Sequence, residues 1–313
     1  MNETKRTNGT SVTGFILLGL PNQLRIQNVL FIVFLLIYIA TVTGNALIIS
    51  VTRLDHHLHT PMYFFLSNLS FLDISYSSSI VPRMLINFLS SRYISYLGCT
   101  TQMYVHLSLG GTECFLLAVM AYDRYVAICN PLRYAIIMNN KACMKIAAGS
   151  WICGFLDALV HTVLALQLPY CGPNEINHFL CEVPAVLNLA CTDISINKIV
   201  IFACAIVVVL FPFLLILFSY IHILSTVLRI RSAEGRYKAF STCASHLMVV
   251  TLFYGAVIFM YMKPKSEHSQ EQDKMATLFY SVVTPMLNPM IYSLRNQEVK
   301  GALRKVVKRK IFC

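Results

Sequence analysis

Isolated acidic residues interrupt long uncharged runs of this sequence. Asp73 and Glu113 each lie near the middle of such a run, and the two runs are consecutive. If these runs cross a membrane, each charge costs at least ~2.5 kcal/mol in the hydrocarbon core, so each is a candidate functional residue. Two carboxylates at similar depth predict a cation site, for Na⁺, or a shared proton. The alternative is that hydroxyl groups, such as those of Ser75 and Thr112, satisfy each carboxylate separately.

A second group of polar residues offers weaker chemistry. Asp157 and His161 lie four residues apart on one helix face, and we expect them to form a structural pair. His106 and Cys204 would supply only two ligands to a metal ion, which is too few to favour a metal site. The sequence shows no constellation of nucleophile, base and oxyanion-binding groups, so an enzyme is not expected.

Composition indicates the elements that hold these residues. Of the 313 residues, 57% are hydrophobic and 12% are charged, and the mean hydropathy is +0.64. The charged fraction is about half that of a soluble domain. A membrane-spanning helix needs about 20 apolar residues. Seven runs reach that length, which predicts an all-α membrane protein built as a seven-transmembrane helix bundle: residues 29–51, 61–82, 93–128, 146–168, 199–228, 239–262 and 275–294.

Basic residues orient this bundle. Most of the 25 lysines and arginines follow the first, third, fifth and last runs, so the positive-inside rule places those segments in the cytoplasm and the N-terminus outside. The net charge of +11 is then a membrane-surface signal, and no nucleic-acid partner is expected. One domain, residues 1–313, is predicted. It comprises an outer tail of residues 1–25 with glycosylation sequons at Asn2 and Asn8, the bundle of residues 26–295, and a cytoplasmic tail of residues 296–313.

Four of the 11 cysteines fall at or beyond the outer ends of the predicted helices: Cys99, Cys171, Cys181 and Cys191. The outside is oxidising, so we expect disulfides there. Four cysteines allow three pairings, and spacing does not choose among them. The long connection over residues 169–197 is expected to form a lid.

Motifs along nearly the whole chain resemble those of rhodopsin-like G-protein-coupled receptors. They are Gly44-Asn45, LSFLD at 69–73, Asp123-Arg124-Tyr125, Trp151, Pro212, Tyr220 and NPMIY at 288–292. Five stretches look like those of olfactory receptors: LHTPMYFFL at 58–66, MAYDRYVAIC at 120–129, Ser219-Tyr220, KAFSTCASH at 238–246 and PMLNPMIYSLRN at 285–296. Phe240 and Ser241 look like the tetrapod-type class of that family. All five stretches occur in order at the expected depths, which makes the match specific.

This resemblance implies an odorant receptor of the plasma membrane, in the cilia of olfactory neurons, that activates a stimulatory G-protein and raises cyclic AMP. It implies a switch in which Arg124 is held by Asp123 at rest and swings toward Tyr220 in the active state. Lys238 begins span six, so no acidic lock on Arg124 is expected, and Tyr254 replaces the tryptophan usual in rhodopsin-like receptors. The other switch residues that the resemblance implies are Tyr125, Asn288, Pro289 and Tyr292.

The resemblance also implies disulfides between Cys99 and Cys181 and between Cys171 and Cys191. It implies that Asp73, Glu113 and Asn288 hold Na⁺ at rest, with no other cofactor. Within residues 296–310 it implies a short amphipathic C-terminal helix on the inner membrane face, and the spacing of apolar and basic residues there agrees.

The expected ligand site lies in the outer half of the bundle. His106 precedes Arg124 by 18 residues, which is about 27 Å along a helix. A stripe at helical spacing runs along the same segment, although ordinary helix packing would explain it too: Met103, His106, Leu107, Gly110 and Gly111. The pocket positions of the family add Cys204, Ala205, Val208, Val257, Ile258, Tyr261, Leu278 and Ser281.

This lining predicts the kind of ligand. It is apolar with few polar groups, and no acid stands at the His106 position, so we expect a small hydrophobic volatile with one hydrogen-bonding group. His106, Tyr261 or Ser281 would anchor it. Gly110 shares a face with Met103 and His106 and is expected at the cavity floor, with Gly111 against a neighbouring helix. A transporter is the alternative function, but it predicts repeats and paired broken helices, which the sequence lacks.

Overall fold

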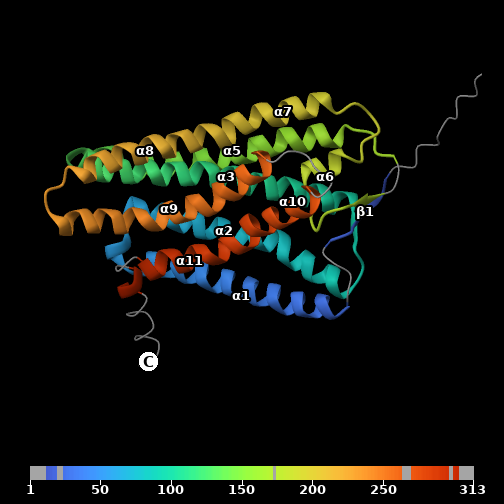
Figure 1. The fold of residues 1–313 in the computed structure, drawn as a ribbon, viewed down its shortest axis with the longest axis horizontal. Coiled ribbons are helices and arrows are strands. Elements are labelled where there is room, and N and C mark those ends of the chain that lie inside the picture. The colour runs from blue at the N-terminus through green and yellow to red at the C-terminus, as the bar shows by residue number, and fades with distance from the viewer. Residues whose placement is uncertain (1–11, 20–23, 172–173, 263–268, 296–298, 303–313) are drawn as a thin grey trace, which may run out of the picture.

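Long helices run side by side along the length of the molecule (Figure 1). The computed structural model describes residues 12–19, 24–171, 174–262, 269–295 and 299–302. The main helices are α1 (Leu24–Leu54), α2 (Pro61–Leu89), α3 (Tyr96–Cys129), α5 (Asn140–Leu166), α7 (Ser195–Ala205), α8 (Phe211–Leu228), α9 (Ala233–Met262), α10 (Ser269–Leu278) and α11 (Thr284–Arg295). Shorter elements are helices α4 (Tyr134–Ile137) and α6 (Val183–Leu187) and strands β1 (Gly14–Leu17), β2 (Tyr93–Ser95) and β3 (Glu175–Ile176).

The predicted seven-helix bundle is confirmed. In chain order the spans are α1, α2, α3, α5, α7 with α8, α9, and α10 with α11. Among the described residues, five helical segments are long and apolar enough to cross a membrane by length and composition alone. Large apolar side chains cover their outer surface: Ile199, Phe202 and Phe211 are 67%, 70% and 53% exposed. Exposed apolar surface on this scale fits contact with lipid.

Two prolines reshape the fifth and seventh spans. A π-helical turn over Ile206–Leu210 joins α7 to α8, and another over Phe279–Val283 joins α10 to α11. Each turn ends two residues before a proline, Pro212 or Pro285. Because proline has no N–H to donate, the carbonyl four residues earlier loses its partner and the hydrogen-bond ladder shifts. The shift changes which side chains of these spans face the bundle interior.

The first and last spans meet closely at Gly44. A Cβ atom built there would lie 3.0 Å from Cγ of Pro289, so a larger residue would push α1 and α11 apart. The next residue, Asn45, is fully buried and donates from Nδ2 to the carbonyl oxygen of Pro285 over 3.0 Å. The Gly44-Asn45 motif therefore holds the proline-broken last span against the first.

A small three-stranded sheet departs from the all-α prediction. β1 pairs antiparallel with β2 and parallel with β3. Phe15 and Leu17 of β1 are buried in an apolar cluster with residues of α3 and the lid segment. Figure 1 shows β1 and α6 at one end of the bundle, opposite the connection between α8 and α9. The predicted lid is thus extended by a part of the N-terminal segment that sequence reasoning left as a tail.

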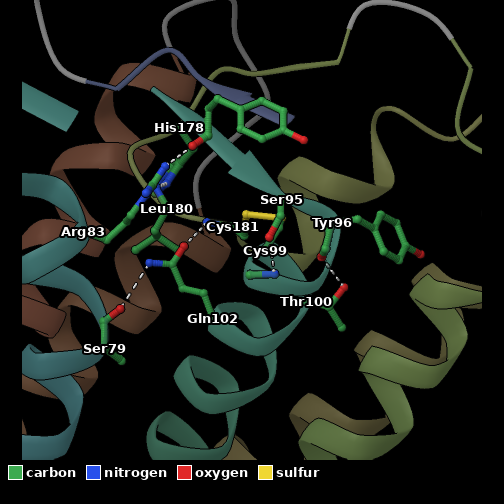
Figure 2. Close-up of a disulfide and its surroundings, with 12 residues drawn as sticks. Ser79, Arg83, Ser95, Tyr96, Cys99, Thr100, Gln102, His178, Leu180 and Cys181 are labelled. Atoms are coloured by element: carbon green, nitrogen blue, oxygen red, sulfur yellow. Dashed lines mark hydrogen bonds between the residues drawn. A yellow bond between two sulfur atoms is a disulfide. The ribbon is translucent and has the colours of Figure 1, made fainter. Parts of the chain in front are cut away.

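Two disulfides and one glutamine fix the lid. The structure joins Cys99 to Cys181 and Cys171 to Cys191, the pairing that the family resemblance implies. The Gln102 side chain accepts from the backbone N–H of Cys181 over 3.1 Å and donates to the carbonyl oxygen of Ser79 over 3.1 Å (Figure 2). Gln102 therefore ties the lid to both α2 and α3.

The two chain ends are only partly described. The sequons at Asn2 and Asn8 lie outside the described residues, so their glycosylation stays a prediction. Residues 299–302 are helical with Val299 and Ala302 buried, and the rest of the predicted amphipathic segment of residues 296–313 lies outside the described residues.

Candidate functional site

A cavity lies between the helices beneath the lid. Its volume is about 150 Å³. An engineered cavity of about 150 Å³ in another protein binds benzene, so the space suits a molecule of that size. Residues of α2, α3, α5, α6, α7 and α9 line it together with both π-helical turns.

Most of the predicted pocket residues face this cavity. They are His106, Leu107, Gly110, Gly111, Cys204, Ala205, Val208 and Val257. The lining also contains residues that sequence reasoning did not assign to a pocket: Tyr76, Cys114, Asp157, His161, Val183, Pro184, Ile201, Val209, Phe253 and Tyr280. The sequence does indicate a cavity at Asp157 and His161, because polar groups within an apolar span need a polar or open surrounding. Val183 and Pro184 reach the cavity through the fold of the lid, which leaves no local signal.

Four predicted pocket residues do not line the cavity. Met103 lines a separate, smaller hollow with Phe15 and Tyr96, and Ile258 packs into the hydrophobic core. Leu278 packs among side chains of α1 and α2, and Ser281 is buried with its hydroxyl donating to the carbonyl oxygen of Thr277 over 2.5 Å. Leu278 and Ser281 miss the cavity because the π-helical turn before Pro285 turns Tyr280 toward it instead. The side chain of Tyr261 lies outside the described residues.

Three aromatic rings form one polar part of the wall: His106, Tyr76 and Tyr280. His106 is 6% exposed, and its ring stacks on Tyr76 with centroids 5.0 Å apart. Its Nε2 lies 3.3 Å from the hydroxyl oxygen of Tyr280. Among the described residues, Nδ1 of His106 has no hydrogen-bond partner. A ligand with one hydrogen-bonding group would satisfy this nitrogen, whose burial without a partner is otherwise unfavourable.

Another part of the wall carries three side chains of different chemistry, Asp157, His161 and Cys204. Nε2 of His161 lies 3.6 Å from Oδ1 of Asp157, which is the pair that their spacing predicts. The Cys204 sulfur joins them, so that one potential ligand atom from each of the three residues lies within 4.8 Å of the others. All three residues line the cavity.

A polar core lies among α2, α3 and α11. Nδ2 of Asn288 donates to both carboxylate oxygens of Asp73, over 3.1 and 3.0 Å. Asp73 and Glu113 are fully buried. Within the described part of the chain, neither carboxylate oxygen of Glu113 nor Oδ1 of Asn288 has a hydrogen-bond partner. Buried oxygens without donors are the ligands that a small hard cation requires, so these residues fit a Na⁺ ion.

The expected ion pair between Asp123 and Arg124 is absent from the described residues. Asp123 instead accepts a hydrogen bond from the Tyr134 hydroxyl over 2.8 Å. Arg124 is 4% exposed, and its Nε and Nη1 have no partner among the described residues. Neighbouring side chains on a helix point about 100° apart, which separates the two groups and lets Tyr134 take the carboxylate. The expectation that Asp123 holds Arg124 is therefore wrong for this structure.

The remaining predicted switch residues surround Arg124 or lie deeper in the bundle. Tyr125 packs beside Tyr220 in a small apolar cluster. Tyr254 is buried and donates to the carbonyl oxygen of Cys114 over 3.3 Å. Tyr292 is buried, and its hydroxyl has no hydrogen-bond partner in the described part of the chain. Pro289, as noted, contacts α1 at Gly44.

Comparison with known proteins decides the family. A family model described as "Olfactory receptor" matches residues 34–310. The chain belongs to the olfactory receptor family. Human olfactory receptor 2A5 is similar to it, with 55% identity over 302 residues that cover 96% of this chain and 97% of the relative. Human olfactory receptor 13F1 is 55% identical over 306 residues, which cover 97% of this chain and 96% of the relative.

The solved structures agree on the fold. The crystal structure of squid rhodopsin superposes with a TM-score of 0.72 and 19% sequence identity, covering 94% of this chain and 88% of that chain. At that identity the likeness shows the fold alone. Together with the family, it makes this olfactory receptor a membrane protein of the G-protein-coupled type and not an enzyme.

Proposed function

We propose that this receptor binds a small hydrophobic volatile in the cavity beneath the lid and responds by activating a stimulatory G-protein, which raises cyclic AMP. The observation that carries the proposal is the cavity of about 150 Å³ with one buried nitrogen that has no partner among the described residues, Nδ1 of His106. An apolar wall with few polar groups is the usual make-up of a small-molecule site. The ligand class is therefore an apolar molecule of benzene size with one hydrogen-bond donor or acceptor.

The proposed response couples this cavity to the Arg124 end of the bundle. Phe253 and Val257 of α9 line the cavity, and His246 of the same helix lies nearer Arg124. A ligand that contacts one arrangement of α9 more favourably than another shifts the balance between the two. Movement of α9 would then uncover the buried Arg124 side chain so that it contacts the G-protein. The lid end would face outward and the Arg124 end the cytoplasm, which the distribution of lysine and arginine supports.

A resident Na⁺ in the polar core is part of the proposal. Asp73, Glu113 and Asn288 would hold it, and their unpaired buried oxygens support this assignment. The ion would offset one of the two carboxylate charges and so favour one packing of α2, α3 and α11. Cell-surface delivery in olfactory cilia, with glycosylated Asn2 and Asn8, completes the proposed setting.

Surface expression with a cyclic-AMP readout tests this function. Cells that display the receptor are exposed to a panel of benzene-sized volatiles that differ in their one polar group. We expect a dose-dependent rise in cyclic AMP for at least one member, and its loss in His106→Leu, which removes the hydrogen-bonding nitrogen. Ile199→Ala, at an exposed position on the outer surface of α7 and outside the cavity lining, is the control. A response that His106→Leu leaves unchanged in potency would move the ligand site elsewhere.

A further inference from the structure

We propose that Asp157, His161 and Cys204 form a Zn²⁺ site in the cavity wall, and that the open coordination position takes a neutral nitrogen or sulfur donor of a small ligand. The ligand half of this inference rests on the proposed function, whereas the metal half stands on the geometry alone. The family resemblance gives Cys204 a place in the ligand pocket but implies no metal at these three residues.

The spacing of the three side chains suits a tetrahedral ion. Asp157 and His161 are one turn apart on α5, so both project from the same face toward α7, which carries Cys204. With metal–ligand bonds of about 2.1 Å, the edge of a tetrahedron is about 3.4 Å long. The Asp157 oxygen and His161 nitrogen are already 3.6 Å apart. The full set lies within 4.8 Å, so a side-chain movement of about 1 Å closes the site around an ion.

Charge balance favours a divalent ion at this depth. Binding releases the thiol proton of Cys204 to solvent, which leaves one thiolate and one carboxylate beside a neutral imidazole. Two negative charges and one Zn²⁺ sum to zero, so the complex carries no net charge into the apolar interior. Asp157 is 10% exposed at its side chain and His161 7%, so water screens the carboxylate poorly without the ion.

The ligand set selects the metal. A thiolate, an imidazole and a carboxylate together are a borderline-soft set, which Zn²⁺ accepts and which Mg²⁺ and Ca²⁺, with their preference for all-oxygen sites, do not. Zn²⁺ also needs no reductant, because it has no redox chemistry in the cell. The described residues contain one such three-residue group.

The site has an open position, and that position faces the ligand. Three protein ligands plus one exchangeable partner is the arrangement of zinc sites that bind small molecules, whereas purely structural sites have four protein ligands. Because all three residues line the cavity, the fourth partner has to come from its contents. A neutral donor keeps the complex uncharged, so the preferred ligand class is a small apolar molecule with a thioether sulfur, a neutral amine or an aromatic ring nitrogen.

Zn²⁺ binding to the purified, detergent-solubilised receptor tests the metal half. We expect about one tightly bound ion in equilibrium dialysis. Loss of even an outer partner of a zinc ligand weakens binding 10–100-fold, so Cys204→Ser and His161→Gln should each weaken it by at least about 100-fold. Cys153→Ser is the matched control, because Cys153 lies on the same helix α5 but is exposed on its outer surface. Retained gel-filtration behaviour and an intact Cys99–Cys181 bridge show that each variant is folded.

Co²⁺ in place of Zn²⁺ gives a spectroscopic readout that does not depend on signalling. A thiolate-to-cobalt charge-transfer band should appear in the wild type and in Cys153→Ser, and disappear in Cys204→Ser. If wild type and Cys204→Ser bind Zn²⁺ equally, or if neither shows the band, then Asp157 and His161 are only a structural pair and the proposal is wrong.

The ligand half is tested with pairs of volatiles that share a skeleton and differ in one ring atom, nitrogen against carbon. In the cyclic-AMP assay we expect the nitrogen member to be at least about tenfold more potent in the wild type, a gap of about 1.4 kcal/mol, and the gap to close in Cys204→Ser. Volatile responses without any difference in Zn²⁺ binding would overturn the metal site and leave the proposed function intact. Normal Zn²⁺ binding without a response to any volatile would overturn the proposed function and leave the metal site intact. Zn²⁺ binding with equal potency of each pair would overturn the assigned ligand class.

Discussion

The hydroxyl of Tyr220 on α8 donates to Nδ1 of His246 on α9 over 2.7 Å. The other ring nitrogen, Nε2, donates to the carbonyl oxygen of Leu117 on α3 over 3.1 Å. Because Nε2 faces a carbonyl, it carries the proton and Nδ1 is the acceptor. His246 is fully buried, so one side chain links three helices next to Arg124. Movement of α9 away from both α3 and α8 has to break both bonds.

His246→Leu should raise the basal activity of the receptor. Each of the two bonds contributes about 0.5–1.5 kcal/mol, so their loss shifts the balance toward the moved arrangement of α9 by at least about fivefold. Basal cyclic AMP per surface receptor measures this. His222→Leu is the matched control, because His222 is an exposed histidine of α8 whose ring lies against those of Tyr125 and Phe218. Unchanged basal activity in His246→Leu would show that these bonds do not hold the resting state.

Arg124→Ala should abolish odorant-stimulated G-protein activation while surface expression stays largely intact. Two guanidinium nitrogens of Arg124 are buried without partners in the described part of the chain, so the side chain adds little to stability here. Its removal leaves the cavity unchanged, because Arg124 does not line it. Arg133→Ala, an exposed arginine near the same end, should respond normally. Normal cyclic-AMP responses in Arg124→Ala would refute the switch assignment.

The closed lid should loosen on acidification. His178 is buried in the lid, and its pKa is lowered to about 4, first by burial and then by the charge of Lys274. In an opened lid the pKa would be about 6.5, so the opened form binds a proton between pH 6.5 and 4 and the closed form does not. The stability of the closed lid is therefore full above pH 6.5 and falls by about 3 kcal/mol toward pH 4.

Hydrogen exchange of residues 174–187 at pH 7 and pH 5, corrected for intrinsic rates, measures this loosening. The ratio of the exchange rate at pH 5 to that at pH 7 should be at least about tenfold larger in the wild type than in His178→Gln. Glu182, whose pKa is raised by burial, acts in the opposite direction, and the comparison with His178→Gln removes its contribution. An equal pH dependence in both proteins would contradict the role of His178.

The sequence predicts the spans of this receptor because a membrane-spanning helix is apolar along one continuous stretch of the chain. A run of apolar residues is read directly from composition, and all seven runs became helices. The β1 strand was not predicted. Its four residues pair with β2 and β3, which lie about 80 and 160 residues further along the chain. Pairing over such separations leaves no local pattern.

The site was predicted where helical spacing holds and missed where the helix changes its period. On α3 regular spacing brings His106 and Gly110 to the cavity as expected, although Met103, one turn nearer the lid, lines a separate hollow. On the last span the π-helical turn adds one residue to a turn, which moves Tyr280 inward and Ser281 away. The predicted ion pair of Asp123 with Arg124 was missed for another reason. Tyr134, which donates to Asp123, lies in a connection whose path the sequence does not fix.

The adjacent glycines of α3 serve different neighbours, and leucine substitutions should separate them. Among the described residues, a Cβ atom at Gly110 would have only the Tyr76 hydroxyl within 4 Å, at 3.3 Å, because the cavity lies beside it. A Cβ atom at Gly111 would lie 3.3 Å from Cα of Gly154 on α5 and 3.4 Å from Cγ1 of Val208. Gly110→Leu should therefore fill the ligand site and weaken the best odorant at least about tenfold, with surface expression kept.

Gly111→Leu should instead force α3 and α5 apart. Overpacking of this kind costs about 1–3 kcal/mol or more, so less receptor should reach the surface. Gly149→Leu is the control for both, since a Cβ atom at Gly149 of α5 would meet no atom of the described residues within 4 Å. Surface staining and dose–response curves of the three variants distinguish the effects. If Gly110→Leu responds with unchanged potency, the ligand does not reach the depth of Gly110, whereas normal surface expression of Gly111→Leu would mean that α3 and α5 tolerate a wider separation than their contact at Gly154 indicates.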